Sequence, residues 1–301
     1  MNKKPNFFII GAPKCGTTAL SEYLKEHPNV FMSTPKEPHY FASEMVKHSS
    51  IKNSEDYFNL FNSVENSHMA VGEASVWYLY SKKAIENIYN FDKNAKIIIM
   101  LRKPVDMVYS MHSQHIYSGS ENEFDFEKAW YLEKDRKEGK SIPRNILYVP
   151  NLFYSEIANY YTQLLNVLNY FPKEQVKVIL FDDFRKDTKL IFDETISFLN
   201  LPPFHKMHFP KVNVNKSIKY KFINSLMAIE PSFIRKNRLR LKKIMGIEKV
   251  EFGAKIKKMN SENKKRNPIN NKIKEVVINN YKDEVVQLSK LLQIDLSNWN
   301  K

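Results

Sequence analysis

A glycine-bounded turn near the beginning of the chain carries residue types that can bind a phosphate or sulfate group. The turn runs from Gly11 to Gly16, holds Lys14, and is followed by Thr17 and Thr18. With either threonine as N-cap, a helix would begin here, and its first backbone N–H groups would have no acceptor within the helix. The helix dipole adds partial positive charge at the same end. We therefore expect this turn to bind an anion.

The residues on either side of the turn predict a strand before it and a helix after it. The apolar run Phe7–Ile10 is too short for a buried helix and is cut by Gly11, which favours a buried parallel strand. Beyond the turn, Leu20, Tyr23 and Leu24 recur at helical spacing. A strand–turn–helix unit would therefore position the anion site.

The spacing of the two glycines matches the Walker A loop of nucleotide-binding proteins, G-x-x-x-x-G-K-[ST], except at one position. Thr17 stands where that motif has its lysine, and Lys14 lies instead inside the turn, between Pro13 and Gly16. Pro13 fixes its own φ angle, and Gly16 lets the backbone close around an anion. A lysine placed there can reach a transferring group rather than the terminal phosphates of a triphosphate.

The run P-K-C-G-T-T resembles the 5′-phosphosulfate loop of the sulfotransferases that use 3′-phosphoadenosine 5′-phosphosulfate (PAPS), in the form found in bacterial and Golgi carbohydrate enzymes. The resemblance implies an α/β fold, a three-layer sandwich with a central, mainly parallel sheet and a P-loop-like phosphosulfate-binding loop. It also implies that PAPS is the co-substrate. The residues that it assigns to donor binding in this loop are Pro13, Lys14, Cys15, Gly16, Thr17 and Thr18.

A second loop supplies a candidate general base. Two prolines flank Lys36 and Glu37, so this segment is neither regular helix nor central strand. A loop after the second strand would face the same crevice as the anion-binding turn. The run K-E-P-H-Y-F resembles the segment that supplies the catalytic glutamate in Golgi-type sulfotransferases, which implies Glu37 as the base and His39 as the reserve candidate. A surface salt bridge is the alternative for Glu37.

A third site candidate follows the apolar run Lys96–Leu101, which predicts a buried parallel strand. Arg102 at its carboxyl end offers a planar fork for phosphate, and Ser110 lies on the predicted helix that follows. This arrangement resembles the family's 3′-phosphate site. In the family a basic C-terminal loop also closes over this phosphate, which makes Lys264, Lys265 and Arg266 further candidates. The run Val176–Phe181 predicts another buried strand.

The segment from Gly72 to Ser75 resembles the family's G-E-x-S-P-x-Y-L segment near the substrate, with two departures. Val76 replaces the expected proline, and Ala74 stands where heparan-type enzymes often carry a lysine. Two roles therefore remain open for Glu73, a structural one and a contact with substrate.

Length and composition indicate one α/β domain over residues 1–301, with a basic, helical C-terminal part from about residue 211. The net charge of +14 suggests anionic ligands, although biased codon usage would give the same excess of lysine. The single cysteine, Cys15, excludes an internal disulfide, and packing explains it better than nucleophilic chemistry. The sequence has no apolar run of about 18 residues and no signal peptide, so we expect a cytoplasmic protein without a transmembrane segment.

The leading functional hypothesis is transfer of a sulfuryl group from PAPS to a hydroxyl or amine, with a carbohydrate as the expected acceptor. Lys14 would supply the cation, so the scheme requires no metal. A P-loop kinase or NTPase is the first alternative, supported by Gly11–Thr18 and by Asp182 after an apolar strand. The second is a non-catalytic binder of polyanions or nucleic acid, supported by the basic run Arg235–Arg266. No nucleic-acid-binding motif accompanies that run, so we expect no nucleic-acid partner.

Overall fold

A computed structural model describes residues 4–45, 51, 53–205, 208–210, 216–218, 261–263 and 266–301. The chain divides into two compact units, the first drawn from residues 1–111, 153–213 and 270–301. The second is drawn from residues 112–152 and 214–269. The single domain over residues 1–301 stays a prediction.

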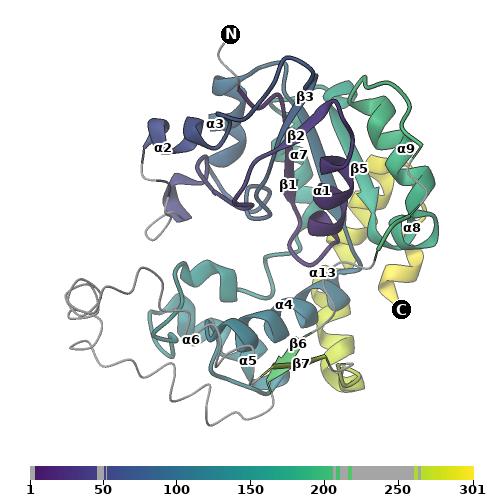
Figure 1. The fold of residues 1–301 in the computed structure, drawn as a ribbon. Helices are drawn as coiled ribbons and strands as arrows, with labels where there is room; N and C mark the ends of the chain where they lie inside the picture. The colour runs from purple at the N-terminus through teal and green to yellow at the C-terminus, as the bar shows by residue number, and fades with distance from the viewer. Residues whose placement is uncertain are drawn as a thin grey trace, which may run out of the picture. The chain divides into compact units, whose positions relative to one another are not determined.

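The first unit is built on a five-stranded sheet in which every pairing is parallel (Figure 1). The strand order is β2-β3-β1-β4-β5, so β1 lies at the centre. The strands are β1 (Phe7–Gly11), β2 (Val30–Met32), β3 (Ala70–Ala74), β4 (Lys96–Leu101) and β5 (Val176–Leu180).

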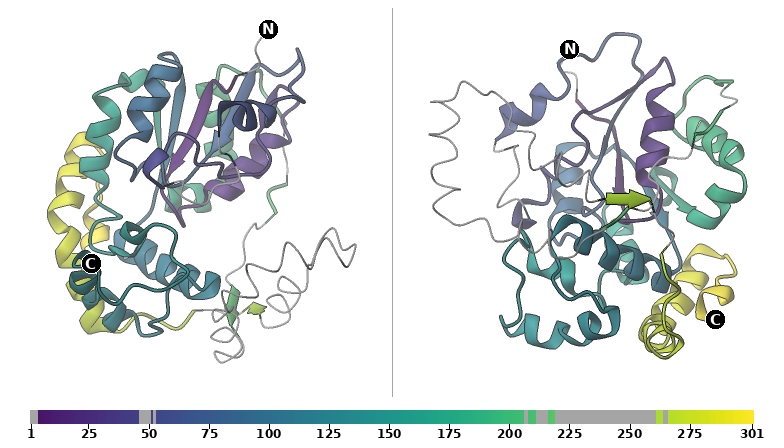
Figure 2. Two further views of the ribbon diagram at one scale, coloured as in Figure 1. Left: turned by 90° about the vertical axis from the view of Figure 1, so that its left-hand side faces the viewer. Right: turned by 60° about the horizontal axis from the view of Figure 1, so that its bottom comes forward.

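Helices cover both faces of this sheet. Helix α1 packs against α9, and α7 packs against α13. Figure 2, in its left panel, shows α13 in yellow on one side of the sheet and α1 in purple on the other. The helical elements that belong wholly or partly to this unit are α1 (Thr17–Lys25), η1 (Ser43–Met45), α2 (Ser54–Asn59), α3 (Ala84–Phe91), α4 (Pro104–Ser118), α7 (Tyr160–Leu168), η3 (Lys173–Gln175), α8 (Phe181–Lys186), α9 (Thr188–Phe198), α13 (Asn271–Leu292) and η4 (Ser297–Asn300). The predicted α/β fold class is confirmed.

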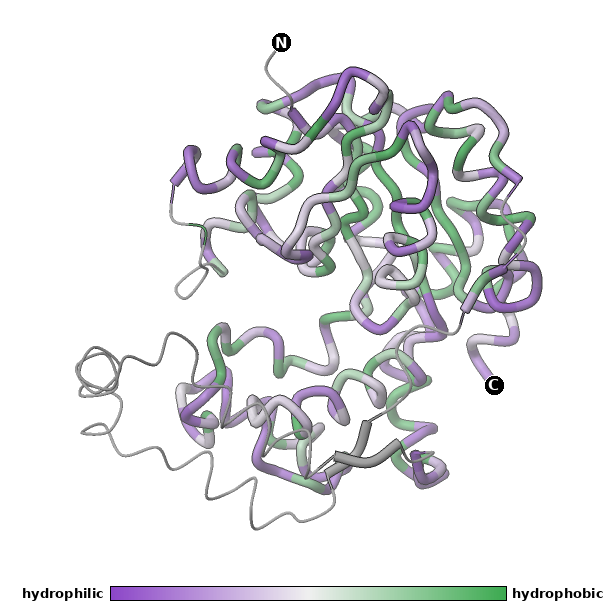
Figure 3. Tube along the Cα trace, viewed as in Figure 1, coloured by the Kyte–Doolittle hydropathy of each residue, from purple (hydrophilic) through white to green (hydrophobic). Residues whose placement is uncertain are grey.

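The core of the unit lies between the sheet and its helices, and Figure 3 shows the strands as the most hydrophobic part of the trace. Every residue of β1 is buried, because helices cover both faces of a parallel sheet. Phe8 points from β1 into an aromatic cluster, where its ring lies 5.6 Å from Phe41 and 6.4 Å from Phe91. These contacts join β1 to the segment that follows β2.

The second unit contains α5 (Phe126–Tyr131), α6 (Glu133–Lys137), η2 (Val149–Leu152) and the end of α4. It also has a two-stranded antiparallel sheet of β6 (Lys216–Ile218) and β7 (Ser261–Asn263). Glu121 and Arg136 form an ion pair of 2.7 Å in which both side chains are fully buried. This pair fixes the turn that precedes α5.

One boundary differs from the sequence expectation. The run Val176–Phe181 is a strand only to Leu180 and lies at the edge of the sheet, where most of its residues are half-buried. Phe181 begins α8 instead. The expected strand is therefore real, but its last residue belongs to a helix whose first turn carries two aspartates.

No helix within the described ranges is both long and apolar enough to cross a membrane. The cytoplasmic location stays a prediction.

Packing around Gly72 gives a test of the sheet. A Cβ atom at this position would lie 2.2 Å from Cζ of Phe7 and 2.6 Å from Sδ of Met32. We expect Gly72→Ala to lower the free energy of unfolding by about 1–3 kcal/mol, measured by urea denaturation, because the core cannot absorb the methyl group. Phe7→Leu removes the clashing ring atoms, so the double variant should lose less stability than the sum of the two single variants. Additive losses would contradict this packing.

Candidate functional site

The loops that follow β1, β2, β3 and β4 meet at one edge of the sheet, because the carboxyl ends of parallel strands lie together. Backbone hydrogen bonds join these loops directly. They run from Ala12 N to Met100 O (2.7 Å), Leu79 N to Ile10 O (2.8 Å), Ser75 N to Ile9 O (3.0 Å) and Glu37 N to Ala74 O (3.0 Å). The edge therefore brings the turn of residues 11–16, the segment carrying Glu37, and the end of β3 into one structure.

The turn between β1 and α1 ends at a glycine, and its binding of an anion stays a prediction. Gly16 is the N-cap of α1 with φ of 93°, in the left-handed region that favours glycine. A Cβ atom there would lie 3.1 Å from two ring atoms of Phe181. Thr17 is the first residue of the helix and Thr18 the second, so neither threonine is the N-cap that the sequence predicted. Because Gly16 has no side chain that could cap the helix, no side-chain cap bonds the first backbone N–H groups of α1.

Cys15 is fully buried within this turn. Its thiol donates to the carbonyl of Pro13 at 3.4 Å, and its Sγ lies 3.9 Å from the hydroxyl oxygen of Tyr160 on α7. Burial raises the pKa of the Cys15 thiol to about 12, against the lowering effects of Tyr160 and of Arg102. The thiol therefore stays protonated and acts as a packing group, as the sequence indicated.

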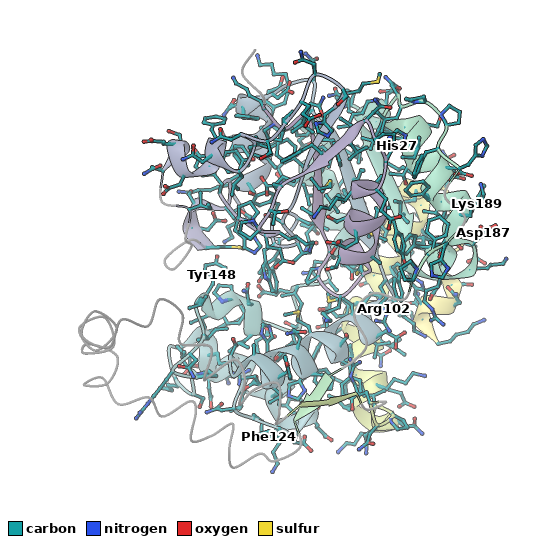
Figure 4. All side chains as sticks on the ribbon, in the orientation of Figure 1. His27, Arg102, Phe124, Tyr148, Asp187 and Lys189 are labelled. Carbon is teal, nitrogen blue, oxygen red and sulfur yellow. The ribbon has the colours of Figure 1, made fainter. Side chains whose placement is uncertain are left out.

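Arg102 reaches the turn from the neighbouring strand. It follows the last residue of β4 directly, and its Nη1 donates to the carbonyl of Lys14 at 3.5 Å (Arg102 is labelled in Figure 4). Its guanidinium carbon lies 4.9 Å from the centre of the Phe181 ring. Arg102 therefore contacts the backbone of Lys14, while the roles of both residues in donor binding stay predictions.

Arg185 is a candidate anion-binding residue that sequence reasoning missed. Its guanidinium carbon lies 5.8 Å from the centre of the Phe181 ring, the ring that also contacts Arg102. Two cationic groups therefore share one aromatic ring beside Gly16. The only available signal was a basic residue four positions after Phe181, which is common on helix surfaces.

The other residues predicted for the 3′-phosphate are less well defined. Ser110 is buried on α4, with 4% of its surface exposed. Lys264 and Lys265 lie outside the described residues, and Arg266 is half-buried. Contact of these residues with a phosphate stays a prediction.

Glu37 forms a charged cluster with its neighbours. Its Oε1 lies 2.8 Å from Nζ of Lys36, and its Oε2 lies 3.6 Å from Nε2 of His39. Burial alone would raise the pKa of the Glu37 carboxyl, but the hydrogen bond with His39 and the charge of Lys36 outweigh burial and lower it to about 2. With 38% of the side chain exposed, Glu37 is an ionised carboxylate that solvent and ligands can reach.

Three of the predicted site residues share an unusual backbone conformation. Lys14, Glu37 and His39 have φ angles of 63°, 63° and 53°. L-residues other than asparagine and aspartate rarely adopt this left-handed region, which costs on the order of 1 kcal/mol or more for each residue. Such conformations persist where the surrounding contacts hold them, and they concentrate at functional sites.

Glu73 on β3 is fully buried, with none of its surface exposed. Its Oε1 accepts a hydrogen bond from Ser75 at 2.6 Å and its Oε2 accepts one from Tyr57 at 2.6 Å. Of the two roles that the sequence left open, the structure supports the structural one.

Among the residues that the structure describes, no group of three or more His, Cys, Asp or Glu side chains is arranged to hold a metal ion.

Comparison with known proteins identifies the family. Residues 4–277 match the family model described as "Sulfotransferase domain". The chain therefore belongs to the sulfotransferase family, which confirms the family and the enzyme class that the sequence predicted. A crystal structure of a sulfotransferase from Alicyclobacillus acidocaldarius superimposes with a TM-score of 0.70 at 25% sequence identity, covering 99% of each chain.

Several similar proteins have names that refer to carbohydrate substrates. Human carbohydrate sulfotransferase 15 is 28% identical over 250 residues, covering 66% of this chain and 44% of that protein. Human bifunctional heparan sulfate N-deacetylase/N-sulfotransferase 3 is 28% identical over 212 residues, covering 68% of this chain and 23% of that protein. The chain thus spans less than half the length of these curated relatives.

The buried, protonated thiol of Cys15 leads to a labelling prediction. With a pKa of about 12, roughly one thiol in 10⁴ is ionised at pH 8, and the thiolate is the species that alkylating reagents attack. We expect iodoacetamide to leave the native protein unmodified at pH 8 and to modify Cys15 fully in concentrated guanidinium chloride, as measured by mass spectrometry. Rapid modification of the native protein would show that the thiol is accessible and ionised. The Cys15→Ala variant serves as the blank.

Proposed function

We propose that this protein transfers a sulfuryl group from PAPS to a hydroxyl or amine group of a carbohydrate. The observation that carries the proposal is the joining of the Gly11–Gly16 turn to Arg102 at the end of β4, in a chain of the sulfotransferase family. In this proposal Lys14 and the N-terminus of α1 would bind the phosphosulfate of the donor, and Arg102 would bind its 3′-phosphate. The names of the relatives support a carbohydrate acceptor.

The turn fits a nucleotide that carries a phosphosulfate. Gly16 packs without a side chain against the Phe181 ring and is the N-cap of α1, whose first backbone N–H groups would bind the ligand. Lys14 would neutralise the charge that develops on the phosphate oxygen as the sulfuryl group departs. Arg102 and Ser110 would hold the 3′-phosphate and so favour this nucleotide over ATP.

Glu37 suits the role of general base better than His39. The Glu37 carboxylate is 38% exposed. By contrast, Nδ1 of His39 is buried with no hydrogen-bond partner among the described residues, and Nε2 faces Glu37. Neither nitrogen of the histidine is thus directed at solvent. His39 instead orients the carboxylate, which would accept the proton that the acceptor group loses as its oxygen or nitrogen bonds to sulfur.

The low pKa of Glu37 has a consequence for catalysis. A carboxylate with a pKa of about 2 is a weak base, because Lys36 and His39 stabilise its charged form. Binding of the acceptor must therefore exchange one of these contacts for the acceptor's own hydrogen bond. The exposed position of the Lys36–Glu37 pair permits that exchange, since an ion pair with solvent access contributes only about 0–1 kcal/mol.

Nucleotide binding tests the proposed donor. We expect adenosine 3′,5′-bisphosphate to bind with micromolar affinity in calorimetry, and Arg102→Ala to weaken binding at least tenfold, because a hydrogen bond to a charged group contributes about 1.5–3 kcal/mol. Lys189→Ala on α9 removes the same charge from an exposed pair with Asp193 and should leave the affinity unchanged. Magnesium-dependent binding of ATP without binding of the bisphosphate would favour the kinase alternative and overturn the proposal.

The pH dependence of kcat/KM separates the two candidate bases. Glu37 with a pKa of about 2 is deprotonated throughout pH 5–8, so its protonation should cause no loss of rate on lowering the pH within this range. A histidine base would give a tenfold loss per pH unit below its pKa, which is ordinarily about 6.5. Glu37→Gln should lower kcat by roughly 10²- to 10⁴-fold while the variant still binds the bisphosphate. Near-normal turnover of this variant would move the assignment to His39.

A further inference from the structure

The buried carboxylate of Glu73 controls the orientation of the hydroxyl groups around it. The carboxyl oxygens of Glu73 accept hydrogen bonds from hydroxyl groups that face them. Ser75 and Tyr57 do so at 2.6 Å each, and Tyr78 contributes a third hydrogen bond. Burial raises the pKa of this carboxyl, while the three hydrogen bonds act in the opposite direction. Each hydroxyl therefore donates its proton in a hydrogen bond to Glu73, and its oxygen lone pairs remain able to accept from other groups.

The three partners of Glu73 hold three consecutive residues of the segment that follows β2. Two of them accept from backbone N–H groups, and the third provides a stacking surface. These contacts are Ser75 Oγ with the His39 amide (3.1 Å), the Tyr57 ring with the Tyr40 ring (centres 4.2 Å apart, planes at 10°) and the Tyr78 hydroxyl with the Phe41 amide (3.2 Å). One carboxylate is thus connected to each of residues 39, 40 and 41.

These contacts lie beside the charged cluster of the proposed active site. His39 is both the first residue held by the network and the partner of the Glu37 carboxylate. Glu37 and His39 have left-handed φ angles, which persist only where surrounding contacts enforce them. The network supplies such contacts at His39, and the hydrogen bond from Glu37 N to Ala74 O supplies another.

We infer that Glu73 is a positioning residue for the general base, an inference that rests on the proposed function of Glu37. Its oxygens orient the hydroxyls around them, so that Ser75 and Tyr78 accept from the amides of His39 and Phe41. These acceptors fix the backbone on which Glu37 and His39 stand. Glu73 touches neither substrate nor donor. It acts through polarity, because a donor in its place would remove an acceptor from the hydroxyls that now donate to Glu73.

The variant Glu73→Gln tests this polarity, since glutamine keeps the shape of the side chain but adds an N–H donor. We expect kcat to fall at least tenfold, with the KM for the acceptor and the dissociation constant of adenosine 3′,5′-bisphosphate changed less than threefold. Tyr57→Phe, which keeps the ring that stacks on Tyr40, should give a smaller loss. Wild-type kcat in Glu73→Gln, or an equal loss of nucleotide affinity, would overturn the inference.

Hydrogen exchange provides a measurement that does not depend on turnover. Glu73→Gln should increase exchange at the amides of His39 and Phe41 by at least tenfold, with the amides of β1 and β4 unchanged. Val277→Ala removes a buried side chain from α13, which packs against α7, and it should lower stability without changing exchange at residues 39–41 or kcat. Unchanged exchange at these two amides would overturn the positioning role. Failure of the proposed function would show separately, as absence of bisphosphate binding by the wild-type protein.

Discussion

The parallel pairing of β1 with β3 on one side and with β4 on the other is the constraint on which the site depends. It places the carboxyl ends of three strands next to one another, so the turn after β1 receives Arg102 from one neighbour and contacts the end of the other. No single loop could gather these groups, because each contributes only one or two of them. Because β1 is central, residues that follow β3 and β4 lie on either side of the turn that follows β1.

The sequence was sufficient to predict the elements that carry their own local signal. An apolar run ended by Gly11 marked β1, and one ended by Arg102-Lys103-Pro104 marked β4. The turn at Lys14 carried the family resemblance. The sequence was insufficient where tertiary contacts decide. Ala70–Ala74 is a fully buried strand with a glutamate in it, a residue that strands disfavour, and only the three hydroxyls that surround this glutamate make its burial possible. Phe181 ends a strand by its sequence and begins a helix in the structure.

Two glutamates, Glu37 in a loop and Glu73 in β3, show how environment separates the properties of two carboxyl groups. Glu37 has a cationic neighbour and partial solvent access, so it remains charged and its pKa is lowered to about 2. Glu73 has hydroxyl neighbours and no solvent access, so burial raises its pKa. Glu37 is exposed enough to exchange its partners for another ligand, whereas Glu73 is too deeply buried to exchange its hydroxyl partners. Residue type alone therefore did not distinguish an exposed, ionised carboxylate from a buried, structural one, whereas the partners of each do.

Backbone conformation provides an independent indication that the two loops belong to one site. Six non-glycine residues of the described chain have positive φ angles, and three of them are Lys14, Glu37 and His39. Neither lysine nor glutamate prefers this region, so glycine or asparagine would be more stable at these positions. The chain has glycine at Gly16, where a side chain would also meet the Phe181 ring. Functional side chains at the other positions therefore cost stability, and the hydrogen bonds from the ends of β3 and β4 compensate for that cost.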